Sequence, residues 1–359
     1  MDFEICARKF GLAIARWFHR NARDLPWRRK RNPYEIWIAE VMLQQTVVAT
    51  VVPRFRRWMK RFPNLESLAQ ASEREVLREW EGLGYYARAR NLHAAARRIV
   101  VEFRGKIPEE PAALRTLPGI GDYTAAAVGA IAFGRPNAVI DANVRRVLSR
   151  IRRWRKWNGS REESARRFLE AAMDSTSPAA FVEGLMELGE TICRPMQAEC
   201  DPCPVGFLCR SRGKDWWRFP ERRRTSVTVL HTDLAVVVDP RKNVFLVPSD
   251  SGRFKGLRVF PALKERNARR RREEVEFLVG QEVVSTSSMK PRVHAYTRYR
   301  DHLKPVKYLV KDSGNGKTGK QKGTARAREK GGCWYSREEA RGQPLPSVMR
   351  KILDEAFST

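Results

Sequence analysis

The chain has 359 residues, 42% of them hydrophobic, with 70 Lys and Arg against 41 Asp and Glu and a sequence pI near 10.6. This length accommodates two or three domains with cores of their own. The sequence lacks a run of about 18 apolar residues and a recognisable secretory signal, so we expect a cytoplasmic, nucleoid-associated protein and no membrane span. The net charge of +29 favours nucleic acid as partner, with an anionic membrane surface as the weaker alternative.

Apolar residues recur at helical spacing through the first half of the chain. The predicted helices are 33–52, 64–80, 87–103, 143–155, 162–173 and 181–193. After a basic, polar stretch at 211–226 the pattern changes. A hairpin is predicted within 234–247, a helix at 266–277 and β structure at 293–310.

The segment around Glu40 is apolar, with Ile36–Ile38 on one side and Val41–Leu43 on the other. A carboxyl group desolvated by such neighbours has a raised pKa and can hold a proton near neutrality. Glu40 is therefore a candidate general acid, and a solvated helix face is the alternative environment.

The segment Leu117-Pro118-Gly119-Ile120-Gly121 precedes an alanine-rich helix. Two glycines permit a tight turn, and the N–H groups at a helix start can bind a phosphate without a side-chain charge. The pattern predicts the hairpin of a helix–hairpin–helix DNA-binding motif, with a plain connecting turn as the alternative.

Asp141 follows the hairpin by twenty residues. An Asp before a helix is most often an N-cap, but a phosphate bound at the hairpin would bring a nucleotide close to it. With Glu40 it would supply the protonated and ionised carboxyl groups that cleavage of a glycosidic bond requires. Asn143 could orient a water or a sugar oxygen.

Four of the six cysteines lie within seventeen residues in the spacing C-x6-C-x2-C-x5-C, at Cys193, Cys200, Cys203 and Cys209. A structural zinc site usually combines two separated Cys pairs. One short loop carrying four thiols favours a [4Fe-4S] cluster. Zinc is the alternative, and four unrelated buried thiols are the last. The other two cysteines are isolated, so no disulfide framework is predicted.

Together these features resemble the MutY family of adenine DNA glycosylases, which shares the helix–hairpin–helix superfamily with endonuclease III. The resemblance runs from about Leu25 to Cys209. The segments that carry it are EVMLQQT (Glu40–Thr46), GLGYYARARNLH (Gly82–His93), LPGIGDYT (Leu117–Thr124), VIDANVRRV (Val139–Val147) and the cysteine loop.

The resemblance implies a reaction and a partner. Glu40 would protonate adenine at N7, Asp141 would stabilise or transiently trap the sugar cation, and Asn143 would orient the carboxylates and water. The implied partner is double-stranded DNA containing adenine opposite 8-oxoguanine or guanine, bound by a monomer, and the implied cofactor is the [4Fe-4S] cluster.

Other residues that match the family are expected to contact DNA. Gln45 and Tyr85 resemble wedge residues that enter the base stack around the oxidised guanine, since an amide replaces lost pairing and an aromatic ring stacks. Helix packing is the alternative for Tyr85. The remaining expected DNA contacts are Gln44, Leu117, Gly119 and Gly121.

Tyr123 distinguishes this chain from the glycosylase/lyases. Enzymes resembling endonuclease III carry there a lysine whose amine attacks the sugar, so the resemblance implies a monofunctional glycosylase with Tyr123 in its catalytic site. Thymine-mismatch glycosylases also carry tyrosine at this place. A thymine or uracil mismatch glycosylase is therefore the alternative function. A non-enzymatic binder of damaged DNA is a second alternative, which the presence of Glu40 and Asp141 disfavours.

The C-terminal region resembles, more weakly, the Nudix-like domain with which MutY enzymes check for 8-oxoguanine. Residues 251–261 fit its glycine-rich hairpin. Thr297 stands in the loop where the family usually has Phe-Ser-His, so it is the candidate contact to 8-oxoguanine. Ala262 and Phe277 replace glutamates that bind magnesium in Nudix hydrolases, so we expect recognition without hydrolysis.

The predicted architecture is a mainly α, bilobal helix–hairpin–helix glycosylase fold with a [4Fe-4S] loop, followed by a C-terminal α+β Nudix-like domain. The catalytic domain would comprise 1–217, with a six-helix lobe at about 30–135 and an iron–sulfur lobe from 1–29 plus 136–217. A linker is expected at 218–230 and the recognition domain at 231–359, with a disordered basic insert at 311–332. A flipped adenine would lie between Glu40 and Asp141.

Overall fold

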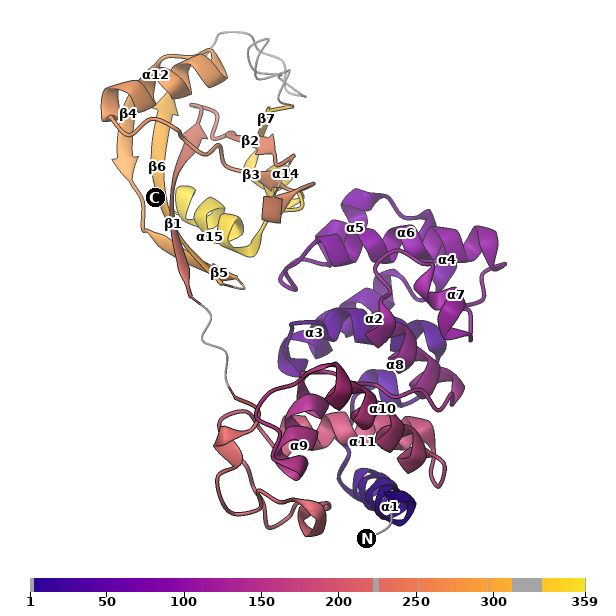
Figure 1. Cartoon of the computed structure of the whole chain (residues 1–359). Helices are drawn as coiled ribbons and strands as arrows, with labels where there is room; N and C mark the ends of the chain where they lie inside the picture. Colours follow the sequence, from indigo (N-terminus) through magenta and orange to yellow (C-terminus); the bar gives the residue numbers. More distant parts are fainter. Residues whose placement is uncertain (1–2, 222–225, 251, 297, 312–330, 359) are drawn as a thin grey trace. The chain divides into compact units, whose positions relative to one another are not determined.

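The computed structural model describes residues 3–221, 226–250, 252–296, 298–311 and 331–358. These residues form two compact units (Figure 1). The helical unit contains the described residues of 1–70 and 91–224, and the sheet unit contains those of 71–90 and 225–359. Within the described ranges, no helix is long and apolar enough to cross a bilayer.

The helical unit consists of helices joined by short connections. Its helices are α1 (Phe3–Asn21), α2 (Pro33–Leu43), α3 (Val48–Arg61), α4 (Leu65–Gln70), most of α6 (Ala87–Glu102), α7 (Pro111–Arg115), α8 (Asp122–Phe133), α9 (Ala142–Arg152), α10 (Gly159–Met173) and α11 (Pro178–Thr191). Short 3-10 turns follow Leu25 and Asp215. Several helices begin at a side chain that accepts a backbone N–H, as Asn158 does for α10 and Ser177 for α11.

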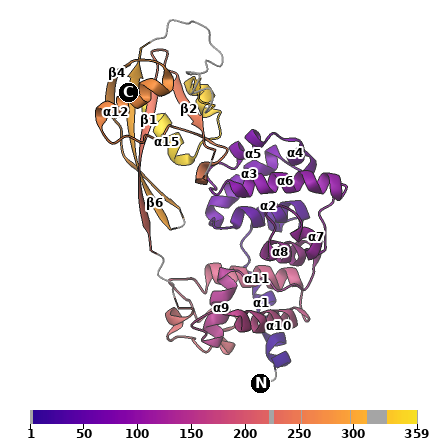
Figure 2. The same ribbon diagram turned by 45° about the horizontal axis from the view of Figure 1, so that its top comes forward.

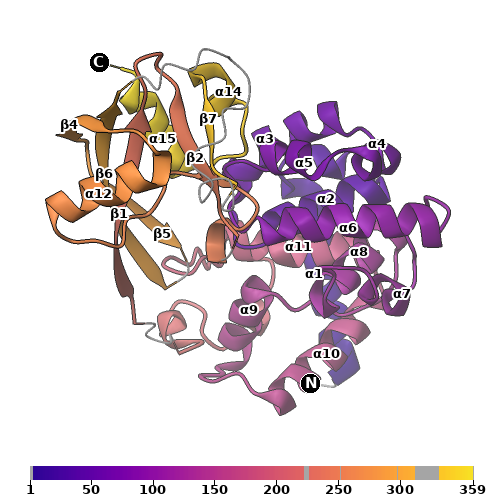
Figure 3. The same ribbon diagram turned by 90° about the horizontal axis from the view of Figure 1, so that it is seen from above.

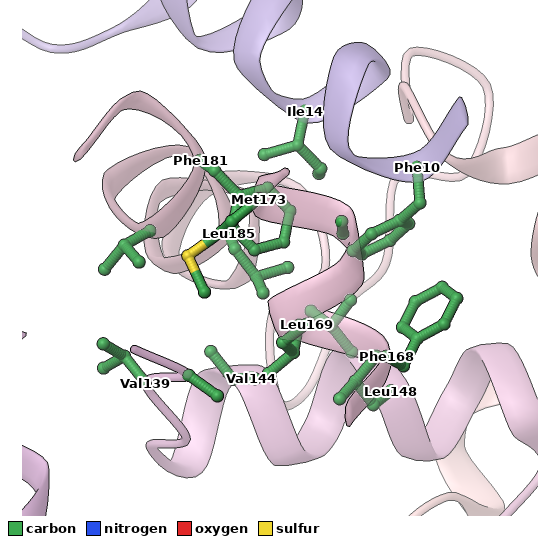
Figure 4. Close-up of a cluster of buried hydrophobic side chains, with 14 of the residues drawn as sticks. Phe10, Ile14, Val139, Val144, Leu148, Phe168, Leu169, Met173, Phe181 and Leu185 are labelled. Atoms are coloured by element: carbon green, nitrogen blue, oxygen red, sulfur yellow. The ribbon is translucent and has the colours of Figure 1, made fainter. Parts of the chain in front are cut away.

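The core of this unit lies where α1, α9, α10 and α11 meet. Figure 4 shows the apolar side chains that these helices contribute to it. Small residues allow the helices to approach closely, and α1 lies beside α10 and α11 (Figure 2). A Cβ built on Gly11 of α1 would stand 2.0 Å from the carbonyl oxygen of Ala172 in α10, and one on Gly184 of α11 would stand 2.9 Å from Ile14.

Two predicted helices are each divided in the structure. The predicted helix 33–52 ends at Leu43, because Gln44 leaves helical geometry (φ −56°, ψ 114°) and Gln45 adopts φ 57°. The predicted helix 64–80 is divided into α4 and α5 (Glu73–Glu79), where Ser72 caps α5 through a reciprocal bond with Glu75. The division of α2 from α3 brings Gln44 and Gln45 to a cavity described below.

The sheet unit is built on one mixed sheet with the strand order β3-β2-β1-β6-β4, in which β5 also pairs with β6 and β7 with β2. Its strands are β1 (Thr228–Val238), β2 (Val244–Pro248), β3 (Arg258–Val259), β4 (Val283–Ser288), β5 (Arg292–Tyr296), β6 (Tyr299–Val310) and β7 (Cys333–Tyr335). The predicted hairpin is confirmed, since β1 and β2 are antiparallel. β1 and β6 are parallel along their length, from Thr228 opposite Tyr299 to Val238 opposite Leu309.

Helices cover both faces of this sheet (Figure 3). Val275 and Val279 of α12 (Ala268–Val279) pack with Val237 and Tyr308 on one face. On the other face, Lys307 donates to the Ala356 carbonyl of α15 (Ser347–Ala356) at 2.9 Å. A shorter helix, α14, spans Arg337–Arg341.

The observed units differ from the predicted boundaries in two places. Residues 71–90 group with the sheet unit, because Arg350 of α15 makes a bidentate ion pair with Glu81 and the Tyr86 hydroxyl donates to the Leu345 carbonyl at 3.4 Å. β1 begins at Thr228, so the strand starts before the predicted linker ends at 230. Most of the basic insert predicted at 311–332 lies outside the described residues.

Candidate active site and cysteine cavity

Glu40 is buried in α2, with 6% of its surface exposed. Asn32 caps this helix and Pro33 occupies its first turn, so the helix begins in a fixed register that turns Ile36 and Trp37 into the core beside Glu40. The Tyr123 hydroxyl donates to Glu40 Oε2 at 3.1 Å. The expected burial of this carboxyl group is therefore confirmed.

Burial raises the pKa of Glu40 to about 7. This value includes smaller contributions from the carboxylates of Glu183 and Asp141, which raise the pKa, and from the Tyr123 hydroxyl and the Arg28 guanidinium, which lower it. Near neutrality a substantial fraction of Glu40 therefore carries a proton, as a general acid must.

Asp141 is the N-cap of α9, the role that its position before a helix predicts. Its Oδ1 accepts the Val144 N–H at 2.6 Å and its Oδ2 accepts from Asn143 Nδ2 at 2.9 Å. Burial raises the pKa of Asp141, while these bonds lower it. The carboxylate is thus held in one orientation by both of its oxygens.

Glu40 and Asp141 line the same cavity of about 470 Å³. Tyr123, Asn143, Gln44 and Gln45 line it as well. With Glu40 and Asp141, six of the site residues singled out in the sequence therefore meet at one cavity. Gln44 Nε2 donates to Thr124 Oγ1 at 3.1 Å, which joins the end of α2 to α8. The size of the cavity suits a small flat ring with a sugar attached.

Charged residues that the sequence analysis did not single out form another wall of the cavity. Arg23 makes two hydrogen bonds with the Glu187 carboxylate, at 2.5 and 2.9 Å. Arg28 donates to Glu183 at 2.9 Å and to Glu187 at 3.0 Å. Burial would raise the pKa of Glu187, but its bonds from the two arginines hold it below the usual value. The i,i+4 spacing of two glutamates in the apolar helix α11 was the signal that could have identified them.

The segment 117–121 forms a turn between α7 and α8. Gly119 has φ +76°, and a Cβ there would lie 2.6 Å from the Cβ of Asn91. Gly121 precedes α8 and has open space around it. Leu117 is buried beneath the turn. This is the backbone that the predicted phosphate-binding hairpin requires.

Two of the predicted DNA contacts lie outside this group. Tyr85 belongs to the sheet unit, where the residue is 39% exposed and its backbone adopts φ 47°. Thr297 lies outside the described residues. Their roles stay predictions.

All four cysteines of the loop line a second cavity, of about 30 Å³. Burial raises the pKa of Cys203 to about 11 and also raises that of Cys209, and in both cases the neighbouring cysteines add to the effect. These thiols therefore stay protonated unless a cation replaces the protons. Within the described ranges, no three His, Cys, Asp or Glu side chains converge as the ligands of a single metal ion do.

Two arginines of α9 join this cavity to the cavity at Glu40. Arg146 donates to Asn143 Oδ1 at 2.7 Å and to the carbonyl of Cys193 at 2.8 Å. One turn further along, Arg150 Nη1 lies 3.1 Å from Cys193 Sγ. A continuous series of hydrogen bonds thus runs from Asp141 through Asn143 and Arg146 to the first residue of the cysteine loop.

Comparison with known proteins supplies a family for this arrangement. The model of the HhH-GPD superfamily of base excision DNA repair proteins matches residues 38–172. The chain is 41% identical over 203 residues to the adenine DNA glycosylase of Mycolicibacterium smegmatis, covering 55% of this chain and 67% of that protein. It is 28% identical over 354 residues to the adenine DNA glycosylase of Buchnera aphidicola subsp. Schizaphis graminum, covering 96% and 98%.

The human adenine DNA glycosylase is 42% identical over 211 residues, which cover 56% of this chain and 39% of the human protein. The chain thus matches about two fifths of the length of its mammalian relatives. Among solved structures, a thermostable thymine-DNA glycosylase matches with a TM-score of 0.51 and 29% identity, over 57% of this chain and 96% of that one. A trapped endonuclease III–DNA covalent intermediate matches with a TM-score of 0.50 and 25% identity, over 58% and 97%.

Proposed function

Because this chain belongs to the adenine DNA glycosylase family of the HhH-GPD superfamily, we propose that it removes adenine paired with 8-oxoguanine or guanine from duplex DNA. Its helical part has the HhH-GPD glycosylase fold, and a C-terminal α/β region follows. One observation carries the proposal. Glu40, with a pKa of about 7, shares a cavity with Asp141, whose two oxygens are fixed by hydrogen bonds.

In the proposed reaction the N-glycosidic bond breaks and its electron pair leaves with adenine. Glu40 donates its proton to N7, so that the base departs neutral. The ionised Asp141 faces the positive charge that develops on the sugar. Water then adds to the anomeric carbon and its proton goes to the Glu40 carboxylate, which restores a protonated Glu40 and an ionised Asp141.

Other residues of the cavity hold these two groups in place. Asn143 fixes one oxygen of Asp141, and the Tyr123 hydroxyl fixes one oxygen of Glu40. Tyr123 also replaces the lysine of a lyase, which supports a monofunctional glycosylase. All these residues come from one chain, so we infer that a monomer suffices.

Duplex binding is proposed to use the hairpin at Gly119 and Gly121, with the net charge of +29 supplying attraction to the phosphates. Gln44, Gln45 and Tyr85 are proposed to contact the opened base stack. The exposure of the Tyr85 ring supports this role, because a ring must be accessible to stack on a base.

The sheet unit is proposed to act as a Nudix-like reader of 8-oxoguanine without hydrolase activity, with Thr297 as the contact. The ion pairs of α12, the helix that would bind magnesium in a Nudix hydrolase, support the expected lack of hydrolase activity. Glu273 is bonded to Arg269, Glu276 to Arg272, and Glu274 accepts the backbone N–H of Lys264. These carboxylates therefore have protein partners in place of a magnesium ion.

A [4Fe-4S] cluster is proposed as the cofactor. All four cysteines line one small cavity, and this shared location supports one iron–sulfur centre. Cys193, Cys200, Cys203 and Cys209 would hold it. When bound, the cluster supplies a rigid cross-link of the loop and a one-electron redox centre.

A thymine or uracil mismatch glycosylase is the second candidate function. Tyr123 favours it, as does the likeness to a thymine-DNA glycosylase structure. The adenine activity is preferred because the relatives at 41% and 42% identity are adenine DNA glycosylases.

One experiment separates the two functions. The protein is incubated with matched duplexes containing adenine opposite 8-oxoguanine, thymine opposite guanine, or uracil opposite guanine, and strands are cleaved with alkali. We expect scission at adenine opposite 8-oxoguanine, and none without alkali. Cleavage of the thymine duplex alone would overturn the proposal. The Asp141→Asn variant serves as the control for contaminating glycosylases.

A further inference from the structure

Ser211 places a hydroxyl group in the wall of the cysteine cavity. It lies two residues beyond Cys209 and lines the same cavity of about 30 Å³ as the four cysteines. The residue is 0% exposed. Among the described residues, its Oγ has no hydrogen-bond partner. A donor buried in this way is rare in proteins and signals a partner that the polypeptide itself does not supply.

The sulfurs of this cavity already accept hydrogen bonds from its other donors. Arg150 Nη1 donates to Cys193 Sγ at 3.1 Å, and the backbone N–H of Ser211 is bonded to the Cys209 thiol. The guanidinium of Arg150 is held by the Arg194 carbonyl at 2.9 Å and stacks on the Trp216 ring at 4.7 Å. Two donors of the wall are therefore directed at sulfur, and the buried Ser211 hydroxyl has no acceptor among the described residues.

We propose that the Ser211 hydroxyl donates a hydrogen bond to a sulfur of the bound cluster, either the Cys209 thiolate or a bridging sulfide, and makes the cluster easier to reduce. This inference rests on the proposed [4Fe-4S] cofactor. Reduction adds negative charge to the sulfurs, so a hydrogen-bond donor stabilises the reduced form more than the oxidised form.

The test measures the reduction potential of the iron-loaded protein before and after Ser211→Ala. Iron and sulfide are quantified first in both proteins. At a fixed applied potential we expect Ser211→Ala to raise the ratio of oxidised to reduced cluster by up to about tenfold, which is about 59 mV for a one-electron couple. The potential moves to more negative values, because the donor is lost.

Ser149→Ala is the matched control. Ser149 is also 0% exposed and its Oγ is also unpartnered among the described residues, but it does not line the cysteine cavity. Its removal should leave the potential unchanged. A second reading comes from exchange into D₂O, after which pulsed magnetic resonance of the paramagnetic cluster should show a deuteron coupling that Ser211→Ala lacks and Ser149→Ala keeps.

Each outcome decides the inference. An iron-loaded Ser211→Ala protein with the parent's potential and deuteron couplings overturns it and leaves the proposed glycosylase intact. If the alanine variant takes up no iron, Ser211→Thr and Ser211→Val replace it. A parent-like reduction potential in Ser211→Thr and a lower one in Ser211→Val would support the hydrogen bond from the hydroxyl. Equal potentials in the two variants would reject it. A parent protein without iron and sulfide would overturn both the cofactor and this inference, and adenine release by that protein would still test the glycosylase separately.

Discussion

The two cavities of the helical unit lie along one helix and differ in the room that they leave beside buried titratable groups. At the N-terminus of α9, a cavity of about 470 Å³ leaves room beside Glu40 and Asp141. At its C-terminal half, a cavity of about 30 Å³ is enclosed by four cysteines. The first has space for a substrate to enter, and the second is small and lined by thiols.

Within the first cavity, the partner of a buried carboxyl group decides its charge more than burial does. Glu187 receives hydrogen bonds from Arg23 and Arg28, and its pKa lies below the usual value. Glu40 receives one from the Tyr123 hydroxyl, and its pKa rises to about 7. The same cavity therefore holds a permanent anion and a group that exchanges its proton near neutrality.

Asp141→Asn should have the largest effect on the rate of adenine release, and it tests whether the two cavities are independent in structure. Adenine release should be abolished, because the amide cannot stabilise a cationic sugar. Asn remains a good N-cap, so α9 and the cysteine loop should keep their structure. Single-turnover assays give the rate, and duplex binding should stay near that of the parent. Turnover at the parent rate would exclude the assigned role.

Glu40→Gln should slow adenine release by about 10²–10⁴-fold, the range for loss of a general acid. In the parent the protonated form of Glu40 is the active one, so the rate should fall as the pH rises through about 7. The variant should lose this dependence. A parent rate that is flat between pH 6 and 8 with chemistry limiting would contradict the role of Glu40.

Gly189→Ala should disturb the connection between the two cavities. A Cβ at Gly189 would stand 2.5 Å from the Cβ of Asn143 and 3.3 Å from Arg146 Nη2. We expect adenine release to fall by about tenfold, since displaced Asn143 no longer fixes Asp141, a misplacement of the kind that costs up to about 10²-fold. Gly159→Ala, which meets open space at the start of α10, is the control. Equal rates in both variants would show that adenine release does not depend on the position of Asn143.

Tyr123→Phe should have the smallest effect, a shift in pH dependence. The Tyr123 hydroxyl lowers the pKa of Glu40, so its loss should raise that pKa above about 7 and move the alkaline fall in rate to higher pH. Tyr34→Phe is the control, because the Tyr34 hydroxyl is bonded to the Phe62 carbonyl away from the cavity. A shift to lower pH would mean that the hydroxyl favours the protonated acid.

The site residues that could be predicted from the sequence are those whose chemistry depends on their neighbours along the chain. Glu40 could be recognised by its apolar neighbours and Asp141 by its place before a helix. The arginine–glutamate wall was missed, because Arg23 and Glu187 are 164 residues apart and neither stands in an unusual local pattern. Such a pair becomes visible when α11 packs beside the segment that follows α1.

The same limit applies to the fold: elements set by local pattern could be predicted, and contacts between distant segments could not. Helix–helix cores and the β1–β2 hairpin follow from periodicity and turn residues. The division of α2 from α3 does not, since glutamine is a good helix former and the hydrogen bond from Gln44 to Thr124 of α8 helps fix its geometry. The parallel pairing of β1 with β6 joins strands far apart in sequence, and no local pattern encodes it.

The pairing of β1 with β6 also has a fixed register over the whole length of β1. Thr228, close to where the chain enters the unit, donates its N–H to the Arg298 carbonyl at 2.7 Å, beside the tip of the β5–β6 hairpin. The far end of β1 lies roughly 30 Å away, at about 3.3 Å per residue. A one-residue slip at the Thr228 end would therefore carry through to Val238 and turn every side chain of β1 to the opposite face of the sheet.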